Sequence, residues 1–213
     1  MRIKAVIFDM DGVLVDTEPV QLTRNREYFK ANGIVYDENE LLKTVGAHSR
    51  LTWEIIRKFF PDGTTNQDYL NGLHAHFNHQ HPNYSDLLND HVIETLQWLK
   101  DRGYKIALAS SGSQEKIKMV VEQCEIAEYF LYRVSGDMFE RSKPDPEIYL
   151  TTAKNLGVKP EECMVVEDSD YGIKAAKSAG MYTVAIREER FLFSQDEADK
   201  IIDHMSDLVK LLD

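Results

Sequence analysis

The chain has 213 residues, with 25 Lys or Arg against 36 Asp or Glu, so its formal net charge is −11 at neutral pH. A sequence pI near 5.1 argues against a general duplex-DNA or anionic-membrane binder, which needs a basic face, while the length suits one domain plus an insertion. No apolar run is long enough for a signal-peptide core or a membrane span, so we expect a cytoplasmic protein with neither membrane nor nucleic acid as a partner. Two cysteines are too few for a disulfide framework, so we expect free thiols.

The first apolar run, residues 3–8, predicts a strand that is buried on both faces of a parallel sheet. It stops abruptly at Asp9-Met10-Asp11-Gly12. Gly12 lets the chain turn sharply there, because it has no Cβ. We therefore expect two carboxylates, Asp9 and Asp11, in a loop directly after the first strand.

The next comparable strand begins only near Tyr104, although a crossover connection needs about a dozen residues or more. The sequence between them has helical periodicity, which predicts helices over about residues 17–32, 51–59 and 66–79. Asp16-Thr17 is expected to cap the first of these helices and to act as a hinge. We therefore predict an α-helical cap at residues 17–87, inserted into a core made of residues 1–16 and 88–213.

Strands and helices alternate regularly after that insertion. Predicted strands cover residues 104–109, 131–134, 164–166 and 182–186, with a weaker one at 201–202. A helix leads into the first of them from Val92, and three more helices lie between the strands: one from the Ser113 cap to Cys124, one from Asp145-Pro146 to Gly157, and one over about residues 171–179. This alternation is typical of an α/β fold with a doubly wound, Rossmann-like parallel sheet.

In an open α/β sheet, ligands bind beyond the carboxyl ends of the strands. Polar residues follow four of the predicted strands: Asp9 and Asp11, then Ser110 and Ser111, then Lys143, then Glu167 and Asp168. Grouped carboxylates repel one another unless a cation lies among them, and their oxygens suit Mg²⁺. Lys143 and the Ser110 hydroxyl can neutralise and hydrogen-bond a phosphate. The composition of this edge therefore predicts a site for a metal ion and a phosphate.

The spacing of the first two acids suits phosphoryl transfer. The Asp9 carboxylate can attack phosphorus and form an aspartyl-phosphate. Asp11, two residues further on, can protonate the leaving oxygen and then take a proton from water. We expect these two residues to be the catalytic pair.

Four segments, in order along essentially the whole chain, resemble the motifs of the haloacid dehalogenase-like (HAD) phosphohydrolases. They are residues 8–17, Ala109-Ser110-Ser111, Ser142-Lys143-Pro144-Asp145-Pro146, and residues 165–169 with their continuation to Met181. The resemblance implies that Asp9 is the nucleophile and Asp11 the acid and base. It implies that Mg²⁺ is held by Asp9, the Asp11 backbone carbonyl and Asp168, with Glu167 as a further contributor. A helical cap after the first strand is also a family feature.

Within that family, the sequence is similar to the β-phosphoglucomutase-like and sugar-phosphate phosphatase group. Mutases of this group usually carry a His near the position of Gln21, and they have a cap loop with a phosphate-gripping Arg, which residues 46–50 resemble with one residue more. Both departures favour hydrolysis. We expect a Mg²⁺-dependent phosphatase of a small phosphorylated metabolite, with a sugar phosphate as the expected class and Arg50 as a substrate anchor.

Other interpretations stay open. The chain fits a phosphosugar isomerase of the β-phosphoglucomutase type, and also a non-catalytic metabolite-binding protein on the same fold. Nothing in the sequence determines the oligomeric state, and a monomer is compatible with it.

Two further features have an interpretation but no clear chemistry. His74, His76, His79 and His81 suggest zinc, but His74 and His81 lie two helical turns apart, too far for one tetrahedral ion, so we expect solvated cap residues. Phe191 and Phe193, in a charged loop, fit either a lid packed on the protein or a contact with a partner.

Overall fold

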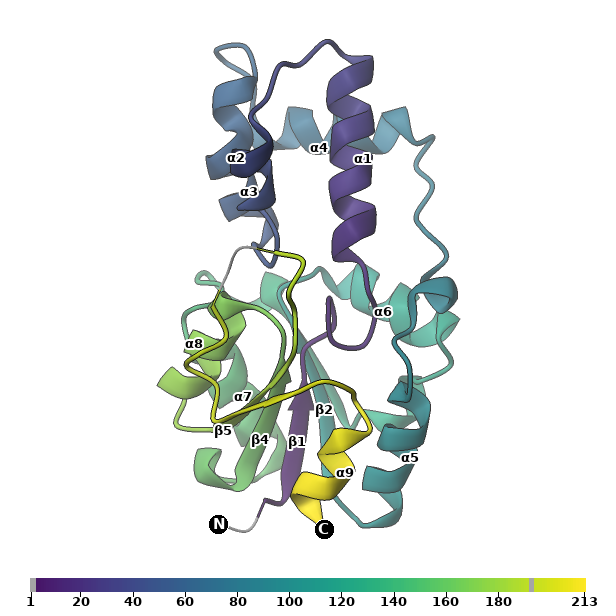
Figure 1. The fold of residues 1–213 in the computed structure, drawn as a ribbon, viewed down its shortest axis with the longest axis vertical. Coiled ribbons are helices and arrows are strands. Elements are labelled where there is room, and N and C mark those ends of the chain that lie inside the picture. The colour runs from purple at the N-terminus through teal and green to yellow at the C-terminus, as the bar shows by residue number, and fades with distance from the viewer. Residues whose placement is uncertain (1–2, 192–193) are drawn as a thin grey trace.

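A computed structural model describes residues 3–191 and 194–213 of the chain (Figure 1). Within these residues, one parallel sheet contains β1 (Ala5–Phe8), β2 (Lys105–Ser110), β3 (Tyr132–Ser135), β4 (Cys163–Glu167), β5 (Tyr182–Ile186) and β6 (Lys200–Ile202). The strand order is β3-β2-β1-β4-β5-β6. The doubly wound α/β prediction is confirmed, and each predicted strand agrees with the structure to within about two residues.

Both faces of the sheet are buried, and the alternation of side chains along β1 shows how. Val6 and Phe8 belong to one apolar cluster, together with residues of α5 (Val92–Asp101), α6 (Gln114–Gln123) and α9 (Asp207–Leu212). Ala5 and Ile7 belong to a second cluster, with α7 (Glu147–Leu156) and α8 (Asp170–Ser178). Burial on both sides explains why the strands read as continuous apolar runs and not as alternating ones.

The ends of two core helices are where the sequence predicted them. The Ser113 side chain accepts a hydrogen bond of 3.2 Å from the Lys116 backbone N–H and so caps α6. Gly157 ends α7 with a left-handed backbone (φ +65°), a conformation that costs other residues more than glycine.

A separate group of helices follows β1 and lies beyond the carboxyl edge of the sheet (Figure 1). It consists of α1 (Glu18–Ala31), α2 (Glu38–Leu42), α3 (Ser49–Ile56) and α4 (Asn66–His76). These helices share an apolar cluster of their own, which includes Leu22, Phe29, Leu41, Ile56 and Leu73. The division of the chain into a cap at residues 17–87 and a core stays a prediction. Below, α1–α4 and their loops are called the helical segment.

Two stretches of chain connect the helical segment to the sheet, and they pair with each other. The Asp16 backbone N–H donates to the Leu87 carbonyl at 2.8 Å, and Asn89 donates to the Leu14 carbonyl at 2.9 Å. Val15 also forms an isolated bridge with Leu88. The two connections therefore leave the sheet side by side.

The structure departs from the sequence prediction in the shortest elements. α2 and α9 have five and six residues, too few to give a periodic pattern. α4 ends at His76, three residues earlier than predicted, because Asn78 and His79 take left-handed backbone conformations.

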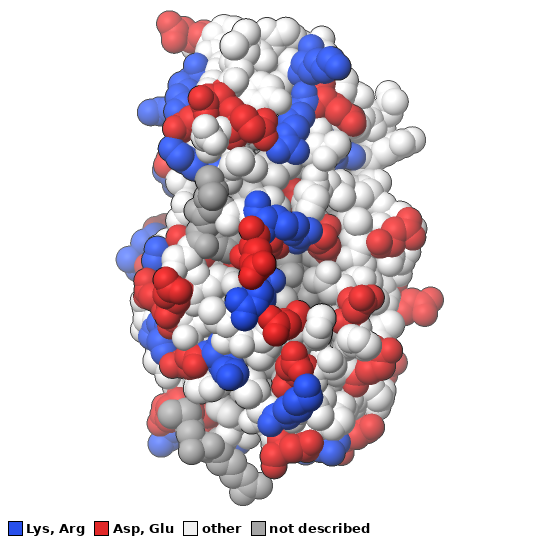
Figure 2. Space-filling view, in the orientation of Figure 1, with Lys and Arg blue, Asp and Glu red and all other residues white. Residues whose placement is uncertain are grey.

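The surface is mixed in charge. Figure 2 shows Lys and Arg interspersed with Asp and Glu over the visible face of both the sheet and the helical segment. Cys124 and Cys163 are buried free thiols. In the part of the chain that the structure describes, no helix has both the length and the apolarity needed to cross a bilayer.

Candidate active site

The parallel sheet brings the strand-end residues together at one edge. Asp9 follows β1, Ser110 is the last residue of β2, and Glu167 is the last residue of β4, with Asp168 directly after it. The Asp9 backbone N–H still pairs with the Val166 carbonyl at 3.0 Å, so the loop leaves the sheet only after this residue. These residues, which are far apart in the sequence, therefore face a common space.

Three carboxylates form a buried cluster at this edge. Asp9, Glu167 and Asp168 each offer an oxygen, and these oxygens all lie within 4.8 Å of one another. The exposed fractions of the three residues are only 7%, 0% and 4%. Within the described residues, no other three His, Cys, Asp or Glu side chains bring their ligand atoms this close together.

Lys143 is buried between two of these acids. Its Nζ donates to Asp9 Oδ1 at 2.5 Å, to Glu167 Oε1 at 2.7 Å and to the Ala109 carbonyl at 3.2 Å. Burial opposes the lysine charge, but the attraction of Asp9 and Glu167 outweighs it and holds the pKa of Lys143 well above its usual range. Lys143 is therefore a fixed cation beside the Asp9 carboxylate.

Glu167 is held by hydrogen bonds on both of its oxygens. Oε1 accepts from Lys143 and from the Tyr149 hydroxyl at 2.6 Å, and Oε2 accepts from the Asp168 and Ser169 backbone N–H groups and from the Ser169 hydroxyl. Burial raises the pKa of Glu167, but the charge and hydrogen bond of Lys143 lower it further, so the net shift is downward. Its lone pairs are largely in use, so its position suits holding Lys143 more than binding an ion.

Asp9 and Asp168 carry charge that a single lysine does not balance. Burial raises the pKa of Asp9 to about 7 against the attraction of Lys143. Burial, together with the charges of Glu167 and Asp9, raises the pKa of Asp168 well above its usual range. Two buried acids with raised pKa values and short oxygen separations form a donor set that suits a hard divalent cation.

Gly12 leaves the room that this arrangement needs. A Cβ at this position would lie 1.9 Å from Asp168 Oδ2, and the backbone φ of +80° is left-handed. The Asp168 carboxylate therefore lies directly against the loop that carries Asp9 and Asp11. The sequence interpretation of Gly12 as a turn residue is correct, and the close approach of Asp168 adds a second reason for glycine.

Asp11 does not join the acid cluster through its side chain. Its Oδ1 accepts from the Lys116 ammonium at 2.7 Å and from the Thr17 hydroxyl. The prediction that Thr17 caps α1 is wrong, because Thr17 makes no side-chain capping bond and its hydroxyl goes to Asp11. Asp16, the other predicted capping residue, instead forms a two-bond ion pair with Arg190 at 2.8 and 2.9 Å.

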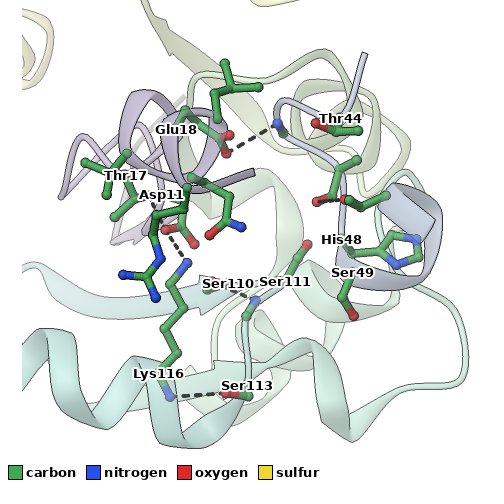
Figure 3. A pocket seen from close by; sticks show the side chains of 18 of the residues that line it. Asp11, Thr17, Glu18, Thr44, His48, Ser49, Ser110, Ser111, Ser113 and Lys116 are labelled. Carbon is green, nitrogen blue, oxygen red and sulfur yellow. Dashed lines mark hydrogen bonds and ion pairs between the residues drawn. The ribbon is translucent and has the colours of Figure 1, made fainter. Parts of the chain in front are cut away.

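Ser110 and Ser111 lie on the floor of the cavity, below the helical segment (Figure 3). Ser110 is 1% exposed, and its hydroxyl accepts from the Gly112 backbone N–H at 3.0 Å. The backbone amides of this turn and the serine hydroxyls are therefore grouped beside Lys143, which also lines the cavity.

The cavity, of about 470 Å³, lies between the sheet edge and the helical segment. Figure 3 shows Glu18 at the start of α1 reaching the loop before α3, with His48 and Ser49 across from Asp11 and Lys116. Glu18 Oε1 accepts from the Gly46 backbone N–H at 3.3 Å, and burial raises the pKa of Glu18 to about 7. A Cβ on Gly46 would lie 2.8 Å from Ser169 Cβ, so this loop closely approaches the core.

Arg50 is not brought into this cavity. Its side chain is 79% exposed, lies 3.9 Å from Glu54 and is absent from the residues that line the cavity. Its role as a substrate anchor stays a prediction. His48 and Ser49, its neighbours in the same loop, do line the cavity.

The histidines lie closer together than the sequence predicted. Because α4 ends at His76 and the chain turns back, the rings of His74 and His81 are 6.2 Å apart, and both line the cavity. The argument from two helical turns is therefore wrong in its geometry. Phe191 packs against the apolar cluster of the helical segment, and Phe193 lies outside the described residues.

Several residues of the site were missed by sequence reasoning. Glu18, Lys116, Tyr149 and Asn25 do not belong to any of the motifs on which the predicted site was based. Each of them acts through a partner far away in the chain: Lys116 and Asp11 are separated by 105 positions, and Tyr69 and Asn25 by 44.

Comparison with known proteins agrees with this geometry. The family model described as haloacid dehalogenase-like hydrolase matches residues 6–186. The chain is 35% identical over 180 residues to a phosphorylated carbohydrates phosphatase of Thermotoga maritima, covering 84% of this chain and 82% of that protein. It is 28% identical over 220 residues to the pyrophosphatase PpaX of Bacillus mycoides, covering 100% and 98%. A crystal structure of a β-phosphoglucomutase from Clostridium difficile superposes with a TM-score of 0.77 at 26% identity, covering 97% and 93%.

Proposed function

The chain belongs to the haloacid dehalogenase-like hydrolase family, and from that premise we propose that it is a Mg²⁺-dependent phosphatase that hydrolyses a small phosphoric monoester, a sugar phosphate being the expected class. The single observation that carries the proposal is the pairing of Asp9 with Lys143 beside Asp168, at the floor of a cavity roofed by the helical segment. In this proposal Asp9 is the nucleophile, Lys143 is a fixed cation, and Asp9 and Asp168 are the acids that bind the metal; their closeness in one cavity supports these roles. The helical segment, as the predicted cap, then supplies specificity.

Asp9 and Asp168, with the Asp11 backbone carbonyl, are the residues that would hold Mg²⁺ in this proposal. Their raised pKa values and short oxygen separation support that assignment. A bound Mg²⁺ supplies positive charge that offsets both the carboxylates and the phosphate oxygens. Glu167 contributes by holding Lys143, since its own oxygens already accept several hydrogen bonds.

The chain's own residues would carry the reaction in two steps. The first step begins with Asp11 protonated: a carboxylate oxygen of Asp9 attacks phosphorus, the bond from phosphorus to the alcohol oxygen breaks, and Asp11 gives its proton to that oxygen. Water then attacks the aspartyl-phosphate while Asp11 takes the water proton, which releases phosphate and restores Asp9. Lys143 stabilises negative charge beside Asp9 throughout, and Lys116 and Thr17 hold the Asp11 carboxyl between steps.

Phosphate release tests this proposal. We expect the wild-type protein to hydrolyse p-nitrophenyl phosphate with MgCl₂ and to stop when EDTA replaces it. Asp9→Asn should abolish turnover, because an amide is a poor nucleophile toward phosphorus. Asp101→Asn, the same change at an exposed residue of α5, is the matched control and should keep full activity. An Asp9→Asn protein with wild-type turnover would refute the nucleophile assignment.

A phosphosugar isomerase is the second candidate, supported by the likeness to the β-phosphoglucomutase structure. Gln21, which lines the cavity, supports hydrolysis instead, because its amide cannot exchange protons as a histidine can. Incubation with β-glucose 1-phosphate and a trace of the 1,6-bisphosphate separates the two: free phosphate supports the phosphatase, and glucose 6-phosphate supports the isomerase. Complete absence of Mg²⁺-dependent phosphate release would favour a binding protein on this fold.

A further inference from the structure

The wall of the cavity that faces away from the acid cluster differs from the sheet edge in its side-chain composition. It is formed by side chains of the helical segment that carry amides and hydroxyls: Gln21, Asn25, Thr44, Thr52 and Tyr69. The phosphate-binding residues are all on the sheet edge. A substrate with its phosphate at Asp9 would therefore present its alcohol portion to this amide and hydroxyl wall.

Asn25 is the one residue of that wall with an unused buried donor. It is 1% exposed, and its Oδ1 accepts from the Tyr69 hydroxyl at 2.7 Å and from Gln21 Nε2 at 3.5 Å. Its Nδ2 is buried and has no hydrogen-bond partner among the residues that the structure describes. A buried donor without a partner is costly, so native proteins rarely keep one unless a ligand or water meets it.

Two of the cations that line the cavity, Lys143 and Lys116, are paired with acids, whereas the contacts of Arg24 are with a carbonyl and an aromatic ring, which do not neutralise its charge. Arg24 donates to the Gln80 carbonyl at 2.9 Å and lies over the Phe77 ring at 3.9 Å.

The imidazoles of the wall add little positive charge. Burial lowers the pKa of both His48 and His74, which favours their neutral forms. Amides, hydroxyls and neutral imidazoles therefore surround Asn25, and Arg24 adds a positive charge to the same cavity.

We propose that Asn25 donates a hydrogen bond to a hydroxyl of the substrate's leaving alcohol, and that this contact favours phosphomonoesters of hydroxylated alcohols over esters whose alcohol portion carries no hydroxyl. The proposal rests on the proposed phosphatase function and adds the part of the substrate that the cap recognises. Binding requires a side-chain rotation, because Asn25 is covered. Gln21 is exposed and holds only Asn25 Oδ1, through a contact at the limit of hydrogen-bond length, so it does not occupy the Nδ2 donor.

The test measures kcat/KM on a panel of phosphate compounds. The panel contains hexose, pentose and glycerol phosphates and fructose 1,6-bisphosphate, whose alcohol portions carry hydroxyls, and p-nitrophenyl phosphate, phosphoglycolate and pyrophosphate, which carry no alcohol hydroxyl. We expect the wild-type protein to prefer a polyol phosphate. Asn25→Leu should lower kcat/KM for that compound by about 10- to 100-fold, while p-nitrophenyl phosphate changes by less than about threefold.

Two further variants keep the test decisive. Asn71→Leu, at an exposed asparagine of α4 outside the cavity, should leave every value unchanged. Tyr69→Phe removes only the hydroxyl that orients Asn25, so a smaller selective loss of about three- to tenfold is expected even where Asn25→Leu folds poorly.

The outcomes separate this inference from the proposed function. If the wild-type protein hydrolyses p-nitrophenyl phosphate but prefers a compound whose alcohol portion carries no hydroxyl, the inference is overturned and the phosphatase function stands. The same holds if the Asn25 and Tyr69 variants lose activity equally on all compounds, since that pattern indicates a structural role only. If no compound releases phosphate, the proposed function fails and this inference fails with it.

Discussion

Replacing Asp9 by asparagine should stabilise the metal-free protein, and the gain should grow with pH. Burial raises the pKa of Asp9 from an ordinary 3.8 to about 7, although Lys143 attracts the charged form. The folded chain therefore holds a proton on Asp9 that the unfolded chain releases, so stability falls as pH rises from the unfolded to the folded pKa. Asparagine resembles the protonated acid and does not carry this penalty.

The size of the stability difference between the wild type and Asp9→Asn follows from the pKa shift of Asp9. A difference of about three pKa units corresponds to about 4 kcal/mol of unfolding free energy, reached fully above pH 7. At pH 5 the folded acid is still protonated, and the difference in unfolding free energy is less than half as large. Asp9 is 7% exposed, so solvent screens little of this. For a chain of this length the unfolding midpoint should rise by about 8–16 °C at pH 8 and by about 3–6 °C at pH 5.

Thermal and urea unfolding in EDTA, followed by circular dichroism at both pH values, measures this difference. Asp101→Asn is the control, since an exposed acid should change stability by less than about 0.5 kcal/mol. Added Mg²⁺ at 100 times its dissociation constant should stabilise the wild type by about 2.7 kcal/mol and the Asp9 variant by less. A gain that is absent, or that is equal at pH 5 and pH 8, would refute the reasoning about Asp9.

Two more substitutions test the packing around the acids. Lys143→Met leaves Asp9 and Glu167 buried without their shared cation, so the unfolding free energy in EDTA should fall by about 3–5 kcal/mol. Phosphate release should also be lost. An unchanged urea midpoint would contradict the ion pairs. Gly172→Ala puts a Cβ 1.7 Å from Glu167 Oε1, a carboxylate fixed on both oxygens, so a loss of about 1–3 kcal/mol is expected in the same assay. Wild-type stability in that variant would show that Glu167 is free to move.

Much of the core could be predicted from the sequence, because its signals are local. Apolar runs buried on both faces and helical periodicity depend on neighbouring residues alone, so the strands, the Ser113 cap and the Gly157 helix end were all predicted. The rule that ligands bind at the carboxyl ends of parallel strands then brought Asp9, Lys143 and Asp168 into one predicted site. The structure brings the same three residues together.

The hydrogen-bond partners of the side chains in the site became apparent only in the tertiary structure. Thr17 had the local signature of a helix cap, but its hydroxyl donates to Asp11. Glu167, expected as a contributor to the metal site, lies in the carboxylate cluster and also accepts hydrogen bonds from Lys143 and Tyr149. Asn25 accepts a hydrogen bond from Tyr69 on another helix. Hydrogen bonds and ion pairs of this kind depend on distance in space between groups far apart in the chain, and no periodicity or motif encodes that distance.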